Sequence, residues 1–525
     1  MKLKPATLRT FTALHSWVGL VAGFALFVAF YAGAITVFRS PLQQWAAPPA
    51  STHATTLADA QRLLDRVLAN HPQAREHLGM TFPGYELAEP TAYWQDDQGI
   101  WQYATPDNPA GSPERPGADL PELVNDLHFS LGIPGIGIWL MGLVSLLYGI
   151  ALVSGVVIHL PRLLKDLFAL RQGRNLKRFW QDAHNVIGVL SLPFHIMFAV
   201  TGALLCLMFV LMLVLNPLVF DGRLMTAAAA AMDTAPVVAK AGIDAPLLSL
   251  ASWRDEAIER AQRQGVENFV PGYLKLAHAG DAHAVVEITG SSMHALGSGT
   301  IAFDASTGTV LANQLAGSRD ANHATLAAVY ALHYGDFGNA VVQWLYFLLG
   351  LGGAFLFYSG NLLWIESRRK HRQVEQGRAQ LAMARATVGI CIGLCVAISA
   401  AAVTSQAVAW LGSHEGWQPG TAERWVCFVT WATCMLWACR RTPIRAAQEL
   451  LWLASVVTLM IPIAHGLATG WWFWRGLLTG QSASAAIDIG AIALALGFSW
   501  LARVTGRRGR QGNPHSVWSE QILAH

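Results

Sequence analysis

The chain has 525 residues, of which 53% are hydrophobic and only 13% are charged. A soluble globular protein carries about 25% charged residues, so the composition excludes an ordinary soluble enzyme and predicts that much of the chain lies in lipid. The formal net charge of +3 is too small to indicate a nucleic-acid partner.

Eight apolar stretches reach or approach the length of about 20 residues that a helix needs to cross a bilayer. They cover residues 14–38, 135–160, 186–213, 341–364, 386–411, 425–438, 449–469 and 485–502, and the sixth of them is short. The sequence therefore predicts an all-α polytopic membrane protein of about eight transmembrane helices.

Lysine and arginine gather in every second connection between these stretches, beginning with the N-terminal tail. Basic connections stay in the cytoplasm, so both termini are predicted to be cytoplasmic, in a bacterial inner membrane, with two long periplasmic segments. The predicted divisions are 1–39 (tail and first span), 40–127 (first periplasmic module), 128–219 (second and third spans with a basic loop), 220–332 (second periplasmic module), 333–370 (fourth span) and 371–525 (an extension with spans five to eight).

Both periplasmic segments begin with an amphipathic helix pattern, at residues 57–68 and 252–261. Strand-like runs follow in the second segment, with a turn at 304–308 between two of them. Because helical and strand periodicities succeed one another, each segment is predicted to form its own small α+β module.

The first four spans contain an internal repeat. His15 near the start of the first span corresponds to His184 near the start of the third, and His128 before the second span corresponds to His333 before the fourth. The pair Ser154-Gly155 likewise corresponds to Ser359-Gly360. The repeating unit is a helix, a periplasmic module, a histidine and a second helix, which makes the repeat parallel.

Ionisable side chains inside membrane helices are functional candidates. Six histidines qualify: His15, His159 and His184 on the cytoplasmic side, His128 and His333 toward the periplasm, and His195 deeper in the third span. In one straight helix, His184 and His195 share a face about 16 Å apart. Two ligand levels in a four-helix bundle suit two haems with paired histidine ligands, and the repeat supplies the pairs His15–His184 and His128–His333.

The competing interpretation is that each histidine lies at the membrane interface or caps a helix. For a single histidine that interpretation is at least as good as a ligand role, and only the paired recurrence favours haem ligation. His159 and His195 correspond in the repeat to Trp364 and Leu26, so both interpretations remain open for them. His465 and His414, in or beside the last four spans, are predicted to be interfacial.

Several short motifs resemble the PepSY-associated transmembrane proteins over residues 10–370. They are His15-x-Trp-x-Gly-Leu-x-x-Gly, Asp126-Leu127-His128, 182–188 (Asp-Ala-His-Asn-Val-Ile-Gly), 332–338 (Leu-His-Tyr-Gly-Asp-Phe-Gly) and Phe303-Asp304-x-x-Thr307-Gly308. The resemblance implies two PepSY-like periplasmic modules, a four-helix core with haem b, and electron transfer to a periplasmic ferric siderophore or other ferric substrate. It also implies that His15, His128, His184 and His333 are axial ligands of the haem iron.

No nucleotide-binding glycine motif occurs in the sequence, so a reductase of this kind would take electrons from quinol or from a separate cytoplasmic reductase. Two rival hypotheses remain. In the first, the chain is a non-redox membrane scaffold whose modules bind or inhibit a periplasmic partner such as a protease. In the second, it is a permease that uses the last four spans, although those spans are predicted to lack charged residues away from their ends.

Overall fold

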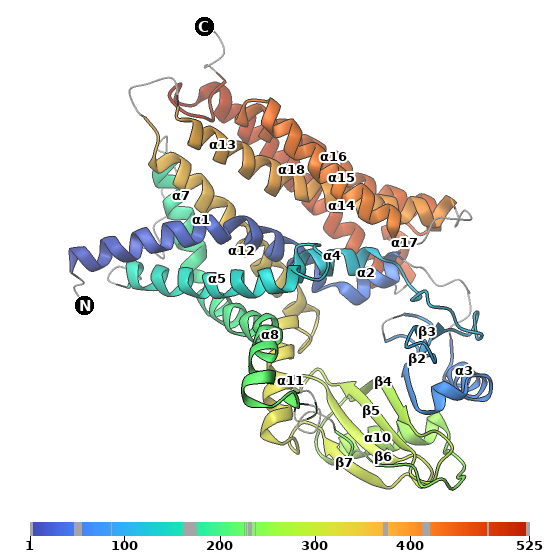
Figure 1. The fold of residues 1–525 in the computed structure, drawn as a ribbon. Helices are drawn as coiled ribbons and strands as arrows, with labels where there is room; N and C mark the ends of the chain where they lie inside the picture. Colours follow the sequence, from blue (N-terminus) through green and yellow to red (C-terminus); the bar gives the residue numbers. More distant parts are fainter. Residues whose placement is uncertain are drawn as a thin grey trace. The chain divides into compact units, whose positions relative to one another are not determined.

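The computed structural model describes residues 4–46, 55–85, 87–160, 176–224, 226, 228, 234–236, 238–370, 376–411, 420–479 and 482–520 (Figure 1). The chain divides into two compact units. The first comprises residues 1–46, 118–210 and 346–525, and the second comprises residues 47–117 and 211–345. Each unit is described below by itself.

The first unit is helical. Its helices, of which α8 and α12 continue into the second unit, are α1 (Pro5–Thr36), α2 (Arg39–Ala46), α4 (Leu120–Ser130), α5 (Gly137–His159), α7 (Leu176–Leu190), α8 (Leu192–Val219), α12 (Ala340–Ser367), α13 (Arg378–Thr387), α14 (Gly393–Leu411), α15 (Thr421–Arg440), α16 (Pro443–Thr469), α17 (Phe473–Thr479) and α18 (Ser482–Gln511). A π-helical segment, Val388–Ile392, joins α13 to α14. The C-terminal extension packs on the N-terminal helices, since Leu394 and Ala397 of α14 share a buried cluster with Phe27 of α1 and Leu127 of α4.

Within the described residues, six helices are long and apolar enough to cross a membrane, and the bent pair α7–α8 makes a seventh candidate. These seven agree with seven of the eight predicted stretches. The remaining stretch forms α15, which is not among the membrane-capable helices. The chain is therefore mostly helical, with about six helices suited to a bilayer, as a polytopic membrane protein requires.

The third predicted span is not one straight helix. The chain bends by 70° between α7 and α8, at Ser191. Pro193 is the second residue of α8, and its ring and missing N–H prevent α7 from continuing through it. The prediction that His184 and His195 share one face about 16 Å apart is therefore wrong, because they lie on different helices.

The connection between α4 and α5 is tight. Leu131 ends α4 in the left-handed conformation, and Gly132 and Gly135 also have positive φ. A side chain at Gly137 would collide with the carbonyl oxygen of Ser130, so only glycine allows α5 to begin this close to the end of α4. This turn fixes where His128, two residues before the end of α4, lies relative to α5.

The second unit contains one antiparallel sheet of seven strands in the order β3-β2-β1-β4-β5-β6-β7 (Figure 1). The strands are β1 (His77–Thr81), β2 (Ala92–Gln95), β3 (Trp101–Ala104), β4 (Val270–Ala277), β5 (Val285–Ser291), β6 (Gly299–Asp304) and β7 (Val310–Gln314). Its other elements are α3 (Leu57–Asn70), a 3₁₀ turn (Pro72–Arg75), α10 (Leu250–Arg263) and α11 (Ala321–Tyr334).

The two segments that were predicted to form separate periplasmic modules share this sheet. Each contributes a helix and its own strands, as predicted, but β1 of the first segment pairs with β4 of the second, from His77 opposite Ala277 to Thr81 opposite Tyr273. Trp94 and Trp253, one from each segment, lie in the same buried core. Pairing joins the two halves because a three-stranded half-sheet alone would leave an edge and an apolar face uncovered.

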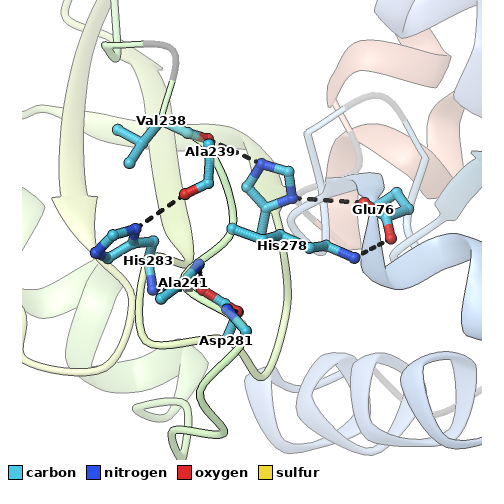
Figure 2. Close-up of polar contacts among 9 residues, drawn as sticks. Glu76, Val238, Ala239, Ala241, His278, Asp281 and His283 are labelled. Carbon is cyan, nitrogen blue, oxygen red and sulfur yellow. Dashed lines mark hydrogen bonds and ion pairs between the residues drawn. The ribbon is translucent and has the colours of Figure 1, made fainter.

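Polar contacts tie the two halves together near the end of β4 (Figure 2). Glu76, from the first half, forms an ion pair with Lys240 and lies 3.5 Å from Nδ1 of His278. The Asp281 carboxylate accepts hydrogen bonds from the backbone N–H groups of Ala241 (2.9 Å), His283 (2.8 Å) and Gly242 (2.7 Å). These bonds lower the pKa of Asp281 to about 2, because they favour the charged carboxylate.

Candidate functional site

A cavity of about 460 Å³ lies within the first unit, between α1, α5, α7, α8 and α12. A volume of this order suits a cofactor or small organic ligand. Four of the six candidate histidines line it, namely His15, His159, His184 and His195. The described residues that line the cavity include no aspartate or glutamate.

His15 is held by the backbone of α5. Its Nδ1 lies 2.8 Å from the carbonyl oxygen of Ala151 and 3.4 Å from the hydroxyl of Ser154. Because a carbonyl only accepts, Nδ1 carries the proton and donates it. The other ring nitrogen, Nε2, is thereby left with a free lone pair, which is the form of imidazole that binds metals.

His184 is held in the same way by α12. Its Nδ1 donates to the carbonyl oxygen of Leu356 at 3.1 Å and lies 3.3 Å from the hydroxyl of Ser359. Ser359 is the repeat counterpart of Ser154, so the two matching serines serve the two matching histidines. The internal repeat is therefore visible in the histidine–serine contacts of the structure as well as in the sequence.

Glycine makes room for each of these rings. A Cβ at Gly155 would lie 3.1 Å from Cε1 of His15, and one at Gly360 would lie 3.4 Å from Cε1 of His184. In both cases the glycine stands four residues after the carbonyl that holds the histidine, one helical turn along the same face. The Ser-Gly pairs noticed in the sequence therefore position and accommodate the imidazoles.

The rings of His15 and His184 lie close together, with 6.2 Å between their centres and an interplanar angle of 81°. Two metal–nitrogen bonds of about 2 Å, together with about 1 Å from each nitrogen to its ring centre, give a spacing of about 6 Å. The ring spacing of this pair would therefore allow both imidazoles to bind one metal ion.

His195 lies in the same cavity but has a different environment. Its side chain is fully buried, its Nδ1 lies 2.6 Å from the hydroxyl of Tyr148, and its Nε2 has no hydrogen-bond partner. A buried imidazole nitrogen without a partner costs free energy unless a ligand satisfies it. Phe30 and Phe357 surround the Tyr148 and His195 rings, so this end of the cavity is mainly aromatic.

His128 lies in α4, outside the lining of this cavity, and repeats the same contacts. Its Nδ1 donates to the carbonyl oxygen of Ala29 in α1 at 2.7 Å, and a Cβ at Gly33 would come within 2.6 Å of that nitrogen. Carbonyl and glycine are again four residues apart. His333 lies in α11, in the second unit, so the predicted pairing of His128 with His333 stays a prediction.

The comparisons with known proteins agree with the motifs. The family model described as the PepSY-associated TM region matches residues 12–367. The chain belongs to this family. An uncharacterized protein of Pseudomonas aeruginosa, PA4219, is 28% identical over 379 residues, which cover 68% of this chain and 89% of that protein. The matched family region contains all six candidate histidines and ends before the C-terminal extension.

The extension contains a buried polar cluster that the sequence analysis missed. His465, predicted to be interfacial, is only 4% exposed, and its Nδ1 lies 2.9 Å from a carboxylate oxygen of Asp488. The other carboxylate oxygen accepts a hydrogen bond from Nε1 of Trp45 at 2.9 Å, and the Trp45 ring packs 5.1 Å from the His465 ring. The signal was present, because Asp488 interrupts an apolar stretch. His414, the other residue predicted to be interfacial, lies outside the described residues.

Proposed function

We propose that the chain is a haem-b-containing inner-membrane reductase that passes electrons to a periplasmic ferric siderophore or another ferric substrate. The observation that carries this proposal is the His15–His184 pair: two imidazoles 6.2 Å apart, each held through Nδ1 by a carbonyl of the neighbouring helix. Neutral imidazole is a common axial ligand of haem iron, and the anchored Nδ1 fixes the tautomer that a ligand needs.

The residues around this pair fit a porphyrin. A Cβ at Gly155 would press on the His15 ring, and one at Gly360 would reach contact distance from the His184 ring, so both glycines leave space beside the imidazoles. Leu152, Val156, Gly188 and Leu356 give the cavity an apolar wall, which suits a flat apolar macrocycle. Haem bound here would supply one-electron transfer, and its potential would be set by the two histidines and the low-dielectric surroundings.

A second haem is proposed from the repeat. His128 has the carbonyl anchor and the glycine that His15 and His184 have, and His333 is its sequence counterpart. Two haems at different depths would carry electrons across most of the bilayer core of about 30 Å. Quinol or a cytoplasmic reductase is the proposed donor.

Reduction of the bound Fe(III) would release iron from its chelate. Fe(III) is a hard cation that binds oxygen donors strongly, and Fe(II) binds them more weakly. The second unit, with its single seven-stranded sheet, is the proposed periplasmic docking part for the ferric chelate.

The test uses the full-length protein purified in detergent. Its reduced-minus-oxidised visible spectrum is expected to contain the sharp α and β bands of six-coordinate haem b, and His184→Ala should lose the contribution of one haem. His77→Ala, which removes an exposed imidazole from β1 outside the cavity, is the matched control and should keep its spectrum.

Activity is tested on the same preparation. The reduced protein is mixed anaerobically with a ferric trihydroxamate chelate, and haem reoxidation is followed together with trapping of Fe(II) by a coloured chelator. Both signals should rise together. Colourless but folded protein, or reduced haem that the ferric chelate does not oxidise, would contradict the proposal, and colourless protein would favour the scaffold hypothesis.

A further inference from the structure

One end of the cavity carries two basic side chains, Lys177 and Arg368, which together form its cationic rim. Lys177 is the second residue of α7, and Arg368 follows the last residue of α12. His159, the last residue of α5, lines the cavity beside them. Three helix termini therefore meet at this end.

The rim lies to one side of the imidazole pair. Lys177 precedes His184 by seven residues, about 10 Å along the helix, and Arg368 follows Gly360 by eight residues, about 12 Å. Long lysine and arginine side chains span much of that distance. Tyr148, His195 and Phe357 lie in the opposite direction along their helices, so the cavity has one cationic end and one aromatic end.

The rim cations have no carboxylate partner among the described residues. Arg368 stacks on the Trp364 ring, 4.2 Å from its centre, and donates to the Ser367 hydroxyl at 3.3 Å. Its neighbour Arg369, by contrast, lies 3.6 Å from the buried carboxylate of Glu366. The positive-inside rule explains cations near these helix ends, but it does not explain why these two line a cavity whose described lining includes no acidic side chain.

Haem b has the complementary polarity, since two propionate carboxylates lie on one edge of an otherwise apolar ring. We propose that Lys177 and Arg368 bind these two carboxylates, so that the propionate edge faces the cationic rim and the apolar edge faces Tyr148 and Phe357. This inference rests on the proposed function. It adds the orientation of the cofactor and two residues that hold it.

The expected contribution is modest and measurable. Ion pairs that water reaches contribute little individually, so loss of both should weaken binding by roughly tenfold. Removing two positive charges near the ring should also lower the haem reduction potential, because the oxidised, more positive state is then less disfavoured.

The test compares two ligands and three proteins. Full-length protein, produced in a haem-deficient host, is titrated with haem b and with haem b dimethyl ester, whose carboxylates are blocked, and the Soret absorbance gives each affinity. Wild type should bind haem b roughly tenfold more tightly than the ester. The double variant K177Q/R368Q should bind the two forms alike. The double variant K370Q/R378Q removes the same charge outside the cavity and should keep the preference.

The outcomes separate this inference from the proposed function. If K177Q/R368Q keeps the full preference for haem b, the rim does not bind the propionates, while the haem site itself stands. If wild type binds haem b and its ester equally well, the same conclusion follows. If wild type binds neither form, the proposed function fails as well. A lower midpoint potential in K177Q/R368Q, with no change in K370Q/R378Q, is the second supporting result.

Discussion

Two clusters in the same unit, the His15–His184 pair and the His465–Asp488 pair, show how differently a membrane protein uses a histidine side chain. His15 and His184 are each anchored through Nδ1 to a backbone carbonyl and line a cavity. His465 is anchored to the carboxylate of Asp488, and Trp45 packs on its ring. The first pair keeps Nε2 free for a ligand, whereas the second cluster satisfies its polar groups within the protein.

The comparison indicates what separates the proposed ligand site from a structural polar cluster. A carbonyl anchor fixes a proton on Nδ1 and directs the Nε2 lone pair to a ligand, and a glycine one turn along leaves space beside the ring. A carboxylate partner and a tryptophan cover fix the imidazole in place. Each of the following substitutions tests this difference, in order from the largest expected effect to the smallest.

The largest effect is expected from filling the space beside the rings. Gly155→Val and Gly360→Val each place methyl groups where the Cβ alone would approach Cε1 of His15 or His184, so each should reduce haem incorporation at least tenfold, or by about 1.4 kcal/mol. Gly149→Val is the control, because no atom lies within 4 Å of a Cβ at that position. The pyridine haemochrome assay measures the amount of haem per protein. A normal haem content in both Gly155→Val and Gly360→Val would contradict the role assigned to the two glycines.

A large effect on stability, without loss of haem, is expected at the second cluster. Asp488→Leu leaves Trp45 Nε1 and His465 Nδ1 without their acceptor, at about 1–3 kcal/mol for each buried donor. The thermal unfolding midpoint in detergent should fall by several degrees while the folded fraction keeps its haem. Asp488→Asn retains one carbonyl acceptor, so its unfolding midpoint should lie between those of the wild type and Asp488→Leu. If Asp488→Leu removed haem at unchanged stability, the cluster would belong to the cofactor machinery.

The serine contacts sharpen the comparison on the side of the ligand pair. Ser359→Ala removes a hydroxyl 3.3 Å from Nδ1 of His184 but leaves the Leu356 carbonyl in place. Loss of an outer-shell partner usually costs about 10-fold or more in metal affinity, and the remaining carbonyl should reduce the cost to a few-fold. The rate of haem transfer to excess apomyoglobin measures it, with Thr404→Ala, which removes a hydroxyl bonded within α14 and outside the cavity, as the control. A change of more than about 100-fold would mean that the hydroxyl, rather than the carbonyl, holds the ring.

The smallest effect concerns the second unit, whose polar contacts join its two halves. The pKa of Asp281 is lowered to about 2 in the folded chain, against about 3.9 in an unfolded one. Its stabilising contribution is therefore fully present above about pH 4 and is lost as the pH falls toward about 2. The thermal unfolding midpoint of the wild type should fall over that pH window. Asp281→Asn should have a lower midpoint above about pH 4 and a smaller fall below it. Parallel curves for the two proteins would contradict this assignment.

Much of the site was predictable because it lies in local, repeated sequence. His15 and His184, with Ser154-Gly155 and Ser359-Gly360, recur at matching positions, and the structure brings each histidine to the Ser-Gly pair of a neighbouring helix. The apolar stretches likewise predicted the membrane-capable helices. Their lengths follow from the bilayer itself, so no tertiary information was needed.

What was missed depends on contacts between distant segments. The pairing of β1 with β4 joins residues nearly 200 positions apart, and no pattern within either strand specifies its partner. The break between α7 and α8 had a local signal in Pro193 that the apolar run concealed. The Asp488–His465 pair was missed because each residue alone resembles an interfacial side chain.

The most direct test of the central claim is the EPR spectrum of the oxidised protein. Two imidazoles whose planes lie at 81° should give the highly anisotropic low-spin signal of perpendicular axial ligands, and His15→Ala and His184→Ala should each abolish that signal. A low-spin signal that survives unchanged in both variants would show that these histidines do not share an iron atom, and the account of the cavity would be wrong.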